Sequence, residues 1–591
     1  MLTENSFGVL SFGLGLASIA VLRISSAVHR MPEADSVLIN GKIVTVDKNF
    51  SIVQAVAIQG GKLIAVGTND QVKSLIGQNT EVIDLRGKTV TPGFIDGHAH
   101  MDREGLRYLY PSLEGAKTKA QILARIEQEV KKVSPGEWVV TRPVGQPPFY
   151  FDALDLLRKG EIPNRWDLDK VAPNNPVYIR HIWGYWNKPP LISIANSKAL
   201  EVGKITESTV SPYGGVQIDK DLNTGKPTGI FLEWSYVPTI EFNLFKDAPR
   251  FTHAMRVEAL KKSMEVYNSY GTTSIYEGHG IAPEVMWVYK DLWTRGKMNV
   301  RSYLVISPNW EAGKDNAVLL RDWAAYAGSK GFGDDMLKIG GVFLQLGGDP
   351  DVARICKAAL PYTAWAAYIY DSTSPEEFEK LTSTVVKGGF RFNSIAVSPT
   401  PVLNIVEKVG RVADLSRQRI VLEHLSLVTQ EDIERMKKLG VVVTTIPAST
   451  IWKYGNDTYS AIAQKTPDLI MPLKSMMEQG IPTVLCTDNV PPSMLHAIWA
   501  TVSRKDRLTG QVISPSQRLS REQALRGATI NGAYLLFAED KIGSIEHGKL
   551  ADLAVLDEDI MSCPEDKIKD IKVLMTMVGG RPVYTDAGGP F

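Results

Sequence analysis

The two ends of the chain share one pattern of hydrophobic and polar positions, and the middle has another. At each end, apolar runs of strand length alternate with Gly, Asn and Asp, which is typical of β-hairpins. These runs are residues 36–46, 53–67 and 82–90 near the N-terminus and residues 552–557 and 571–584 near the C-terminus. We expect residues 35–90 and 538–591 to form one composite β-sheet domain.

The middle alternates apolar runs with helices that carry clear start signals. Ser374-Pro375 and the two acids after it begin one helix, and Ser520 with Gln523 forms a capping box for another. The apolar runs in this region are residues 336–343, 390–397, 420–425, 441–447 and 482–488. This alternation predicts βα units, so we expect residues 91–537 to form an α/β domain of the TIM-barrel type. In such a barrel the chemistry lies at the C-terminal ends of the strands.

One short stretch stands out within this pattern, Pro92-Gly93-Phe94-Ile95-Asp96-Gly97-His98-Ala99-His100. Residues two apart on a strand point to the same side, so His98 and His100 can present two imidazoles in one direction. Two imidazoles so placed are typical ligands of one metal ion. The alternative is a strand end that carries two histidines by chance, although the chain holds only nine histidines in 591 residues.

Composition and charge exclude several classes of protein. The net charge is +1, with 66 basic and 65 acidic residues. The sequence has no long basic run, so its charge does not suggest nucleic-acid binding. The three cysteines, Cys356, Cys486 and Cys563, are too few and too scattered for a disulfide framework or a cysteine metal cage. The length favours one large domain with a smaller one.

The role of the N-terminal residues 1–30 is a separate question. Residues 7–22 carry no charge, but the run is shorter than the roughly 20 residues of a membrane-spanning helix. Glu4 precedes the run and Arg23 follows it, which is the wrong charge order for an ordinary secretory signal. Three interpretations stay open: a membrane-associating segment, a signal peptide, or a helix packed on the protein itself. The compartment, cytoplasmic or membrane-associated and secretory, is therefore not assigned.

The stretch from Pro92 to His100 resembles the first-strand signature of the amidohydrolase superfamily. From about Asp35 to Tyr584 the chain is similar to its amidohydrolase-3 or YtcJ-like branch, which includes N-substituted formamide deformylases. The resemblance implies a (β/α)8 barrel with a small β-sandwich made from both chain ends. It also implies a divalent metal ion, Zn²⁺ above all, and a small-molecule substrate.

The same resemblance implies further site residues. Lys338 falls where the family carries a carbamylated lysine (carboxylysine) that bridges two metals, although Gly340-Gly341 follows it where the family has Asp-Gly. A barrel lysine paired with a carboxylate is the alternative. His424 ends a run similar to the sixth-strand motif with its metal-binding histidine. Asp488 matches the eighth-strand aspartate, which contacts the metal and shuttles the proton.

The sequence departs from the family pattern at the fifth strand and further upstream. Ile395 stands where the family has a histidine ligand, so one ion is favoured over two, and Asn393 is a substitute donor on the same side of the strand. Tyr185 follows a glycine where the family has a histidine that faces the substrate. We expect Tyr185, Trp186, Asn393, Glu233 and His279 to contact the substrate, with His279, at the end of a predicted third strand, as a spare ligand.

The leading hypothesis is a metal-dependent hydrolase of a C–N bond, of the amide or formamide type, with an apolar or aromatic substituent on the substrate. His98, His100, His424, Asp488 and Lys338 are the expected ligands, and Asp488 is the proton shuttle. A mononuclear lyase, hydratase, decarboxylase or isomerase on the same scaffold is the alternative, because the fifth-strand histidine is replaced. A non-catalytic descendant of the fold is a third hypothesis. The sequence leaves the oligomeric state open.

Overall fold

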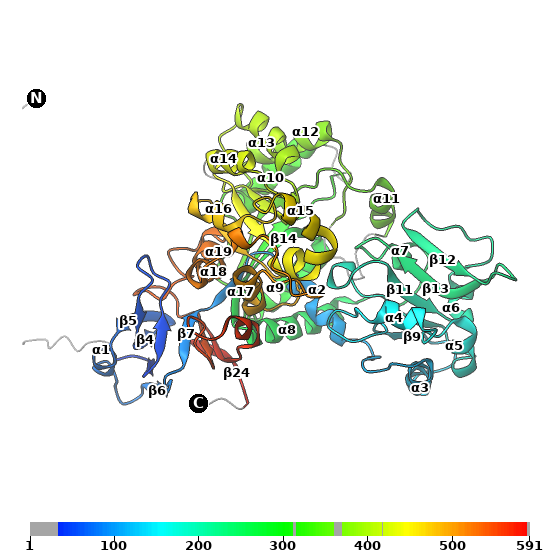
Figure 1. Cartoon of the computed structure of the whole chain (residues 1–591), viewed down its shortest axis with the longest axis horizontal. Helices are drawn as coiled ribbons and strands as arrows, with labels where there is room; N and C mark the ends of the chain where they lie inside the picture. Colours follow the sequence, from blue (N-terminus) through cyan, green and yellow to red (C-terminus); the bar gives the residue numbers. More distant parts are fainter. Residues whose placement is uncertain (1–32, 311–314, 360–368, 416–417, 588–591) are drawn as a thin grey trace, which may run out of the picture.

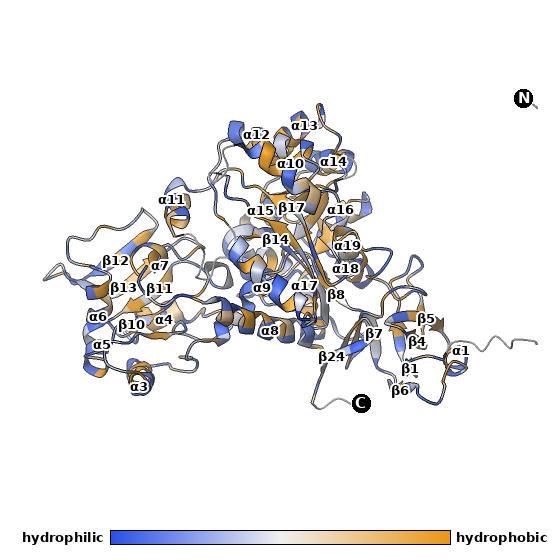
Figure 2. Cartoon of the chain, turned by 180° about the vertical axis from the view of Figure 1, so that it is seen from behind, coloured by the Kyte–Doolittle hydropathy of each residue, from blue (hydrophilic) through white to orange (hydrophobic). Residues whose placement is uncertain are grey.

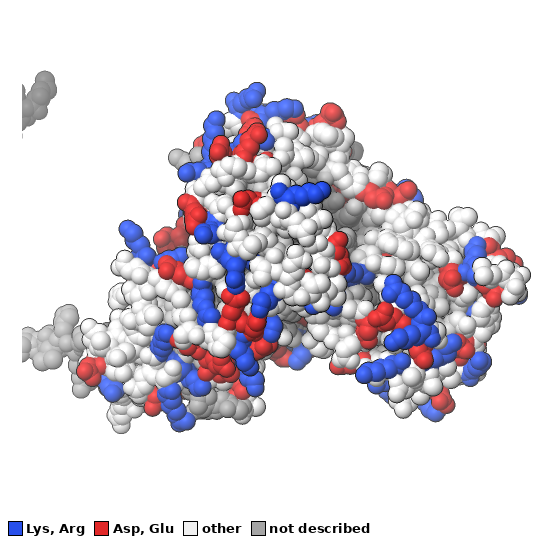
Figure 3. All heavy atoms as spheres, in the orientation of Figure 1, with Lys and Arg blue, Asp and Glu red and all other residues white. Residues whose placement is uncertain are grey.

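The computed structural model describes residues 33–310, 315–359, 369–415 and 418–587, so the apolar segment of residues 7–22 lies outside it. Within these ranges, none of the helices combines the length and the apolar character that a membrane crossing requires. On the face drawn in Figure 3, acidic and basic side chains are interspersed and neither sign covers a broad area.

Eight parallel strands form a nearly closed barrel, which confirms the predicted fold class. They are β8 (Phe94–Asp96), β14 (Thr272–Ile281), β15 (Arg301–Ile306), β17 (Leu337–Phe343), β18 (Phe392–Ile395), β19 (Val421–Glu423), β20 (Val442–Thr445) and β21 (Thr483–Leu485). Gly97 donates its backbone N–H to the Leu485 carbonyl at 3.2 Å, and Asp488 donates to the His98 carbonyl at 2.9 Å. These two bonds tie the first barrel strand to the last. The five apolar runs of the middle correspond to β17 through β21.

Helices cover the outside of the barrel, each with one apolar side turned inward. They include α10 (Asn316–Ala327), α12 (Pro375–Lys387), α13 (Thr400–Gly410), α14 (Gln430–Leu439) and α16 (Leu473–Glu478). Figure 2 shows blue and orange stretches next to each other in outer helices such as α12, as expected of helices with one buried face. The side chain of Ser374 accepts a hydrogen bond from Glu377 N and so begins α12 as the sequence predicted.

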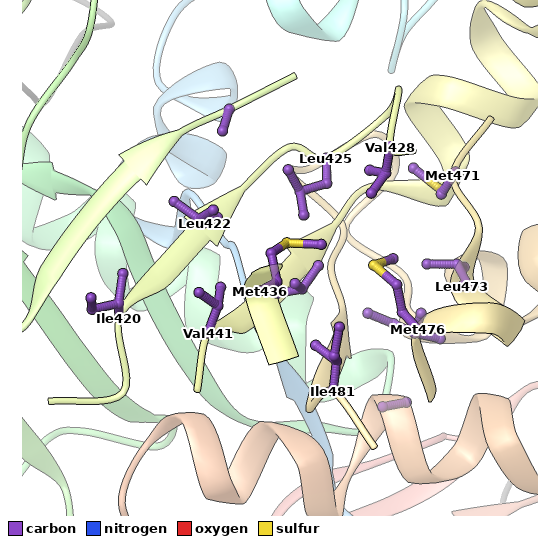
Figure 4. Close-up of a cluster of buried hydrophobic side chains, with 14 of the residues drawn as sticks. Ile420, Leu422, Leu425, Val428, Met436, Val441, Met471, Leu473, Met476 and Ile481 are labelled. Carbon is purple, nitrogen blue, oxygen red and sulfur yellow. The ribbon is translucent and has the colours of Figure 1, made fainter. Parts of the chain in front are cut away.

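A dense apolar layer joins these helices to the strands. Figure 4 shows Leu422 of β19 near Met436 of α14 and Ile481 before β21. All three side chains are at most 3% exposed. Because burying one such side chain stabilises the fold by about 1.5–3 kcal/mol, this layer holds the strand ends in fixed positions.

The barrel interior is filled by large side chains, and its N-terminal end is plugged. Tyr276, Tyr303 and Phe343 lie in one cluster with Val421 of β19. Residues of α19 (Ile530–Leu535) and the chain after it belong to the same cluster and close the end of the barrel where the strands begin. The open end is therefore the C-terminal one.

The two ends of the chain meet in one sheet beside the barrel. Its order is β24-β23-β22-β7-β2-β3, and it pairs β7 (Thr89–Pro92) antiparallel with β22 (Leu553–Leu556). The other strands are β2 (Lys42–Val44), β3 (Ile52–Val53), β23 (Val573–Val578) and β24 (Arg581–Thr585). Figure 1 shows the blue N-terminal and red C-terminal strands side by side. Because β7 runs straight into β8, this sheet fixes where the first barrel strand begins.

Another sheet is inserted in the sequence between β8 and β14, which pair with each other in the barrel. Its order is β12-β13-β11-β10-β9, and it is drawn in cyan on the right of Figure 1. Its strands are β9 (Val139–Thr141), β10 (Val177–Ile179), β11 (Leu191–Ala195), β12 (Val216–Lys220) and β13 (Pro227–Glu233). The range 91–537 expected for the barrel thus contains a sheet of its own, which the sequence pattern did not predict. We call residues 109–250 the inserted segment.

Candidate metal centre and substrate pocket

The first barrel strand presents its histidines through a fixed turn. The carboxylate of Asp96 accepts hydrogen bonds from His98 N at 3.2 Å and Thr487 N at 3.0 Å, which locks the ends of β8 and β21 together. The Asn489 side chain donates to the His100 carbonyl at 2.9 Å. The backbone of both histidines is therefore held before any ligand binds.

Three imidazoles converge at the C-terminal end of the barrel. His424 Nε2 lies 3.2 Å from His98 Nε2 and 3.1 Å from His279 Nε2. Nitrogens that bind one tetrahedral ion at about 2.0–2.1 Å lie about 3.3 Å apart. The observed spacing fits three ligands of a single cation.

A carboxylate completes this cluster on the side of His100. Asp488 Oδ1 lies 2.8 Å from His100 Nε2, and Asp488 Oδ2 lies 3.9 Å from His424 Nε2. Asp488 is fully buried, and neither of its oxygens accepts a hydrogen bond within the described part of the chain. A buried carboxylate is costly unless it is paired, so this arrangement suits a bound cation. His98, His100 and Asp488 form one group of candidate ligands, and His98, His279 and His424 form another.

Buried acids stand behind the histidines. Glu423 Oε2 lies 3.4 Å from His98 Nδ1, and Glu277 Oε2 lies 3.7 Å from His100 Nδ1. A carboxylate behind a ligating imidazole fixes its tautomer and makes its other nitrogen a better ligand. Gly278 leaves room for this pair, because a Cβ there would lie 2.3 Å from Glu423 Oε1.

Burial sets the protonation of the cluster. It lowers the pKa of His98 to about 3 and moves the pKa values of His100, His279 and His424 well below their ordinary value. The imidazoles are thus neutral near pH 7, the form that binds metals. Burial raises the pKa of Asp488 well above its ordinary range, a cost that a nearby cation removes.

The backbone at the strand ends is strained. His424 has φ 61°, Asp488 has φ 48° and Asn489 has φ 59°, all in the left-handed region that residues other than glycine rarely adopt. Such strain persists only where the surrounding structure imposes it, and it concentrates at functional sites.

A cavity of about 800 Å³ opens next to the histidines. Barrel residues that include His279, His424, Ile395 and Ser449 line one side, and Trp183, Tyr185 and Trp234 of the inserted segment line the other. Aromatic side chains also contribute from Tyr213, Tyr236, Tyr370, Tyr454 and Tyr459. A cavity of this size and character suits a small molecule with an apolar part.

The prediction for Lys338 needs correction. Lys338 is the second residue of β17 and pairs with Tyr303, so it lies at the plugged end of the barrel, near Asp335 and Lys541. At the other end of β17, Phe343 faces His279, with ring centroids 5.6 Å apart. The structure therefore does not bring Lys338 to the histidines, and a bridging carboxylysine has no place beside them.

Of the two fifth-strand residues considered above, one lines the cavity and the other lies in the barrel interior. Ile395 lines the cavity, in the position where the resemblance led us to expect a histidine. Asn393 lies deeper in the barrel, where its Oδ1 accepts a hydrogen bond from the Tyr276 hydroxyl and its Nδ2 lies 3.4 Å from the Val342 carbonyl. Asn393 is thus held by the barrel interior and does not replace the missing ligand.

Only some of the residues expected to contact substrate line the cavity. Tyr185 lines the cavity, but Trp186 is fully buried beneath the Arg107 guanidinium, 3.6 Å from its ring. Glu233 ends β13 and accepts a hydrogen bond from Thr239 N at 2.9 Å, at the start of helix α7 (Thr239–Asn243). Trp186 and Glu233 therefore have structural positions. His279 lies near the C-terminal end of β14, the second barrel strand rather than the third, and it joins the histidine cluster.

Sequence reasoning missed several residues around the site. Glu423 and Glu277 precede His424 and Gly278 directly, and each is an acid within an apolar strand, a signal that was available. The sequence around Lys453 gives no comparable indication of a site residue. It is 2% exposed, burial lowers its pKa to about 7, and its ammonium group donates to the Asn187 carbonyl at 3.1 Å.

These features define a metal-dependent hydrolase fold: a (β/α)8 barrel whose histidines and aspartate meet at the C-terminal ends of the strands. A model of the amidohydrolase family matches residues 81–584, so the chain belongs to the amidohydrolase family, hydrolases that act on carbon–nitrogen bonds other than peptide bonds.

Individual proteins are similar to this chain in sequence or in fold. The N-substituted formamide deformylase of Arthrobacter pascens is 28% identical over 581 residues, covering 94% of this chain and 99% of that protein. The protein YtcJ of Bacillus subtilis is 23% identical over 92% of this chain and 98% of its own length. The crystal structure of an uncharacterized metal-dependent hydrolase from Pyrococcus horikoshii has a TM-score of 0.63, with 21% identity over 90% of this chain and 99% of that one.

Proposed function

We propose that this protein hydrolyses the amide or formamide bond of a small molecule with an apolar or aromatic substituent, at a centre that holds one divalent ion. The convergence of three imidazole nitrogens at 3.1 and 3.2 Å beside the buried Asp488 carboxylate carries the proposal. The similarity to a formamide deformylase and the aromatic cavity support the choice of substrate.

His98, His279 and His424 would hold the ion, with His100 and Asp488 beside them. A single ion is favoured because Ile395 stands where the resemblance places a histidine ligand, and because Lys338 lies at the other end of β17 from Phe343, which faces His279. When bound, a divalent ion such as Zn²⁺ polarises a carbonyl and lowers the pKa of water.

The chain's own groups would carry out the proton transfers. Asp488 has two buried oxygens without hydrogen-bond donors in the described structure, so it can accept a proton from the attacking water. It would then deliver this proton to the leaving nitrogen. The cavity wall of Trp183 and Tyr185 would orient the substituent and exclude bulk water.

Metal content and turnover test the proposal together. The full-length protein would be purified, its metals measured by mass spectrometry, and its activity assayed on N-benzylformamide, N-butylformamide and benzamide. We expect about one divalent ion per chain, loss of formate release after chelation, and recovery on adding Zn²⁺. A protein without metal, or one whose turnover survives complete metal removal, would contradict the proposal. One ion per chain without hydrolysis of any amide, but with elimination or isomerisation of a test substrate, would favour the lyase or isomerase alternative.

A further inference from the structure

Tyr185 connects the inserted segment to the metal centre. It lies in the short helical turn η2 (Gly184–Trp186), far in sequence from the barrel strands. Its hydroxyl oxygen is 3.4 Å from His424 Nδ1 and 3.2 Å from Ser449 Oγ, and its side chain lines the cavity. The phenol therefore lies between a candidate ligand and the space for substrate.

The hydrogen bonds of this phenol can be assigned one by one. His424 turns its Nε2 toward His98 and His279, so as a ligand it carries its proton on Nδ1. That N–H donates to the Tyr185 oxygen, and the Ser449 hydroxyl donates to it as well. The Tyr185 oxygen is the acceptor in both contacts, so its own O–H is not used in either of them. Because the side chain lines the cavity, a carbonyl oxygen bound there can accept this proton.

We propose that the Tyr185 hydroxyl is a catalytic hydrogen-bond donor to the substrate carbonyl oxygen, strengthening as that oxygen gains negative charge. The inference rests on the hydrolysis proposed above. The hydroxyl proton stays on Tyr185, and no covalent bond to this residue forms or breaks. A donor aimed at developing charge in a dry site accelerates reaction more than it aids substrate binding.

Lys453 is the positioning residue for this donor. It ends the π-helical segment η4 (Ala448–Lys453), a rare form that often marks functional sites. Its ammonium group donates to the backbone carbonyls of Tyr185 and Asn187 and lies 4.7 Å from the centre of the Tyr185 ring. Ser449, from the same segment, contacts the hydroxyl. One element of the barrel thus holds both the backbone and the tip of Tyr185.

The first test replaces Tyr185 with phenylalanine, which removes only the hydroxyl. We expect kcat to fall by about 10²–10³-fold, as for loss of an oxyanion donor, with KM within about threefold and unchanged metal content. Tyr178→Phe is the matched control, because it removes a buried phenol 3.5 Å from Ser193 in the inserted sheet, away from the cavity. Unchanged kcat in Tyr185→Phe would overturn the inference. So would a loss of metal proportional to the loss of activity, since Tyr185 would then only support His424.

A binding measurement separates this inference from the proposed reaction. Benzohydroxamate, whose oxygens resemble a charged carbonyl at a metal, would be titrated calorimetrically into the zinc-loaded wild type and Tyr185→Phe. We expect at least about tenfold weaker binding to the variant, by the loss of one hydrogen bond to a charged group. If the wild type binds zinc and the probe but hydrolyses no amide, the proposed function fails while this comparison still tests Tyr185. Equal affinities would overturn the role of the hydroxyl.

The positioning role is tested by combining variants. Lys453→Met should lower kcat with little change in KM or metal content, and adding Lys453→Met to Tyr185→Phe should cause almost no further loss. Effects that multiply in the double variant would overturn the positioning role. Because Lys453 is buried, Ser449→Ala serves as a milder second variant, and thermal unfolding midpoints show which proteins remain folded.

Discussion

Charged side chains at the two ends of the barrel differ in whether they have hydrogen-bond partners. At the plugged end, Arg301 pairs with Asp552 at 2.7 Å and Arg419 pairs with Glu539 at 2.6 Å. At the open end, Glu423 and Asp488 are fully buried, and no described residue donates a hydrogen bond to their oxygens. These two pairs at the plugged end are ordinary structural ion pairs, each of an arginine with a carboxylate.

Buried carboxylates to which no described residue donates a hydrogen bond therefore mark the functional end of the barrel. Buried carboxylates that accept no hydrogen bond and face neutral imidazoles are unstable unless a cation or proton compensates them. Histidines that face one another at 3.1 and 3.2 Å need the same explanation. Both features occur at the open end. The substitutions below test whether metal binding and activity depend on the open end and not on the plugged end.

Removing a histidine from the open end should have the largest effect. His98→Ala takes away the imidazole shared by the group of His98, His279 and His424 and the group of His98, His100 and Asp488. We expect loss of bound metal and at least about a 10³-fold fall in kcat/KM, because the bound ion supplies several kcal/mol of charge stabilisation. Metal analysis and formate release measure both. His253→Ala, at a half-exposed position on α8 (His253–Ser269), is the control, and a His98→Ala protein with full metal content would contradict the assignment.

Asp488→Asn should come next. The amide keeps the shape of the side chain but cannot accept and deliver the proton, so we expect kcat to fall by about 10²–10⁴-fold. Steady-state kinetics on the best formamide of the panel would measure this. Asp322→Asn, an exposed pair with Arg321 on α10, is the control. A kcat within a few-fold of wild type would remove Asp488 from the mechanism.

Glu423→Gln should act through metal affinity. Because Glu423 lies behind His98 Nδ1 at 3.4 Å, its neutral amide should weaken zinc binding by about 10–100-fold. Competition with a fluorescent chelator gives the affinity, and saturating zinc should restore most of the activity. Glu407→Gln on the barrel surface provides the comparison. Unaltered zinc affinity would mean that Glu423 has no role behind the ligand.

Lys338→Met, at the plugged end, should have the smallest effect of these substitutions. Since Lys338 lies beside Asp335 and Lys541 at the plugged end, we expect metal content and kcat/KM within about twofold of wild type. The free energy of unfolding should change by about 0.5 kcal/mol or less. Urea unfolding and metal analysis would check both. Loss of metal in this variant would favour the hypothesis that Lys338 is a bridging ligand, which the structure does not support.

Much of the fold followed from local patterns. The apolar runs gave the positions of β17 through β21, because a buried parallel strand must be apolar on both faces. The spacing of His98 and His100 and the placement of His424 directly after β19 followed from the same logic, and the structure brings these residues together. The position of Lys338 at the start of its apolar run was also visible, and it should have placed this lysine at the plugged end.

Periodicity and the ends of the apolar runs were enough to predict the barrel, the pairing of the two chain ends and the first histidines of the site. The place of His279 in the cluster, the positions of Trp186 and Glu233 away from the cavity, and the contact of Lys453 with Tyr185 became visible only in the folded chain. A strand pattern fixes which side a residue faces, whereas a contact between distant segments depends on how loops and inserted strands pack.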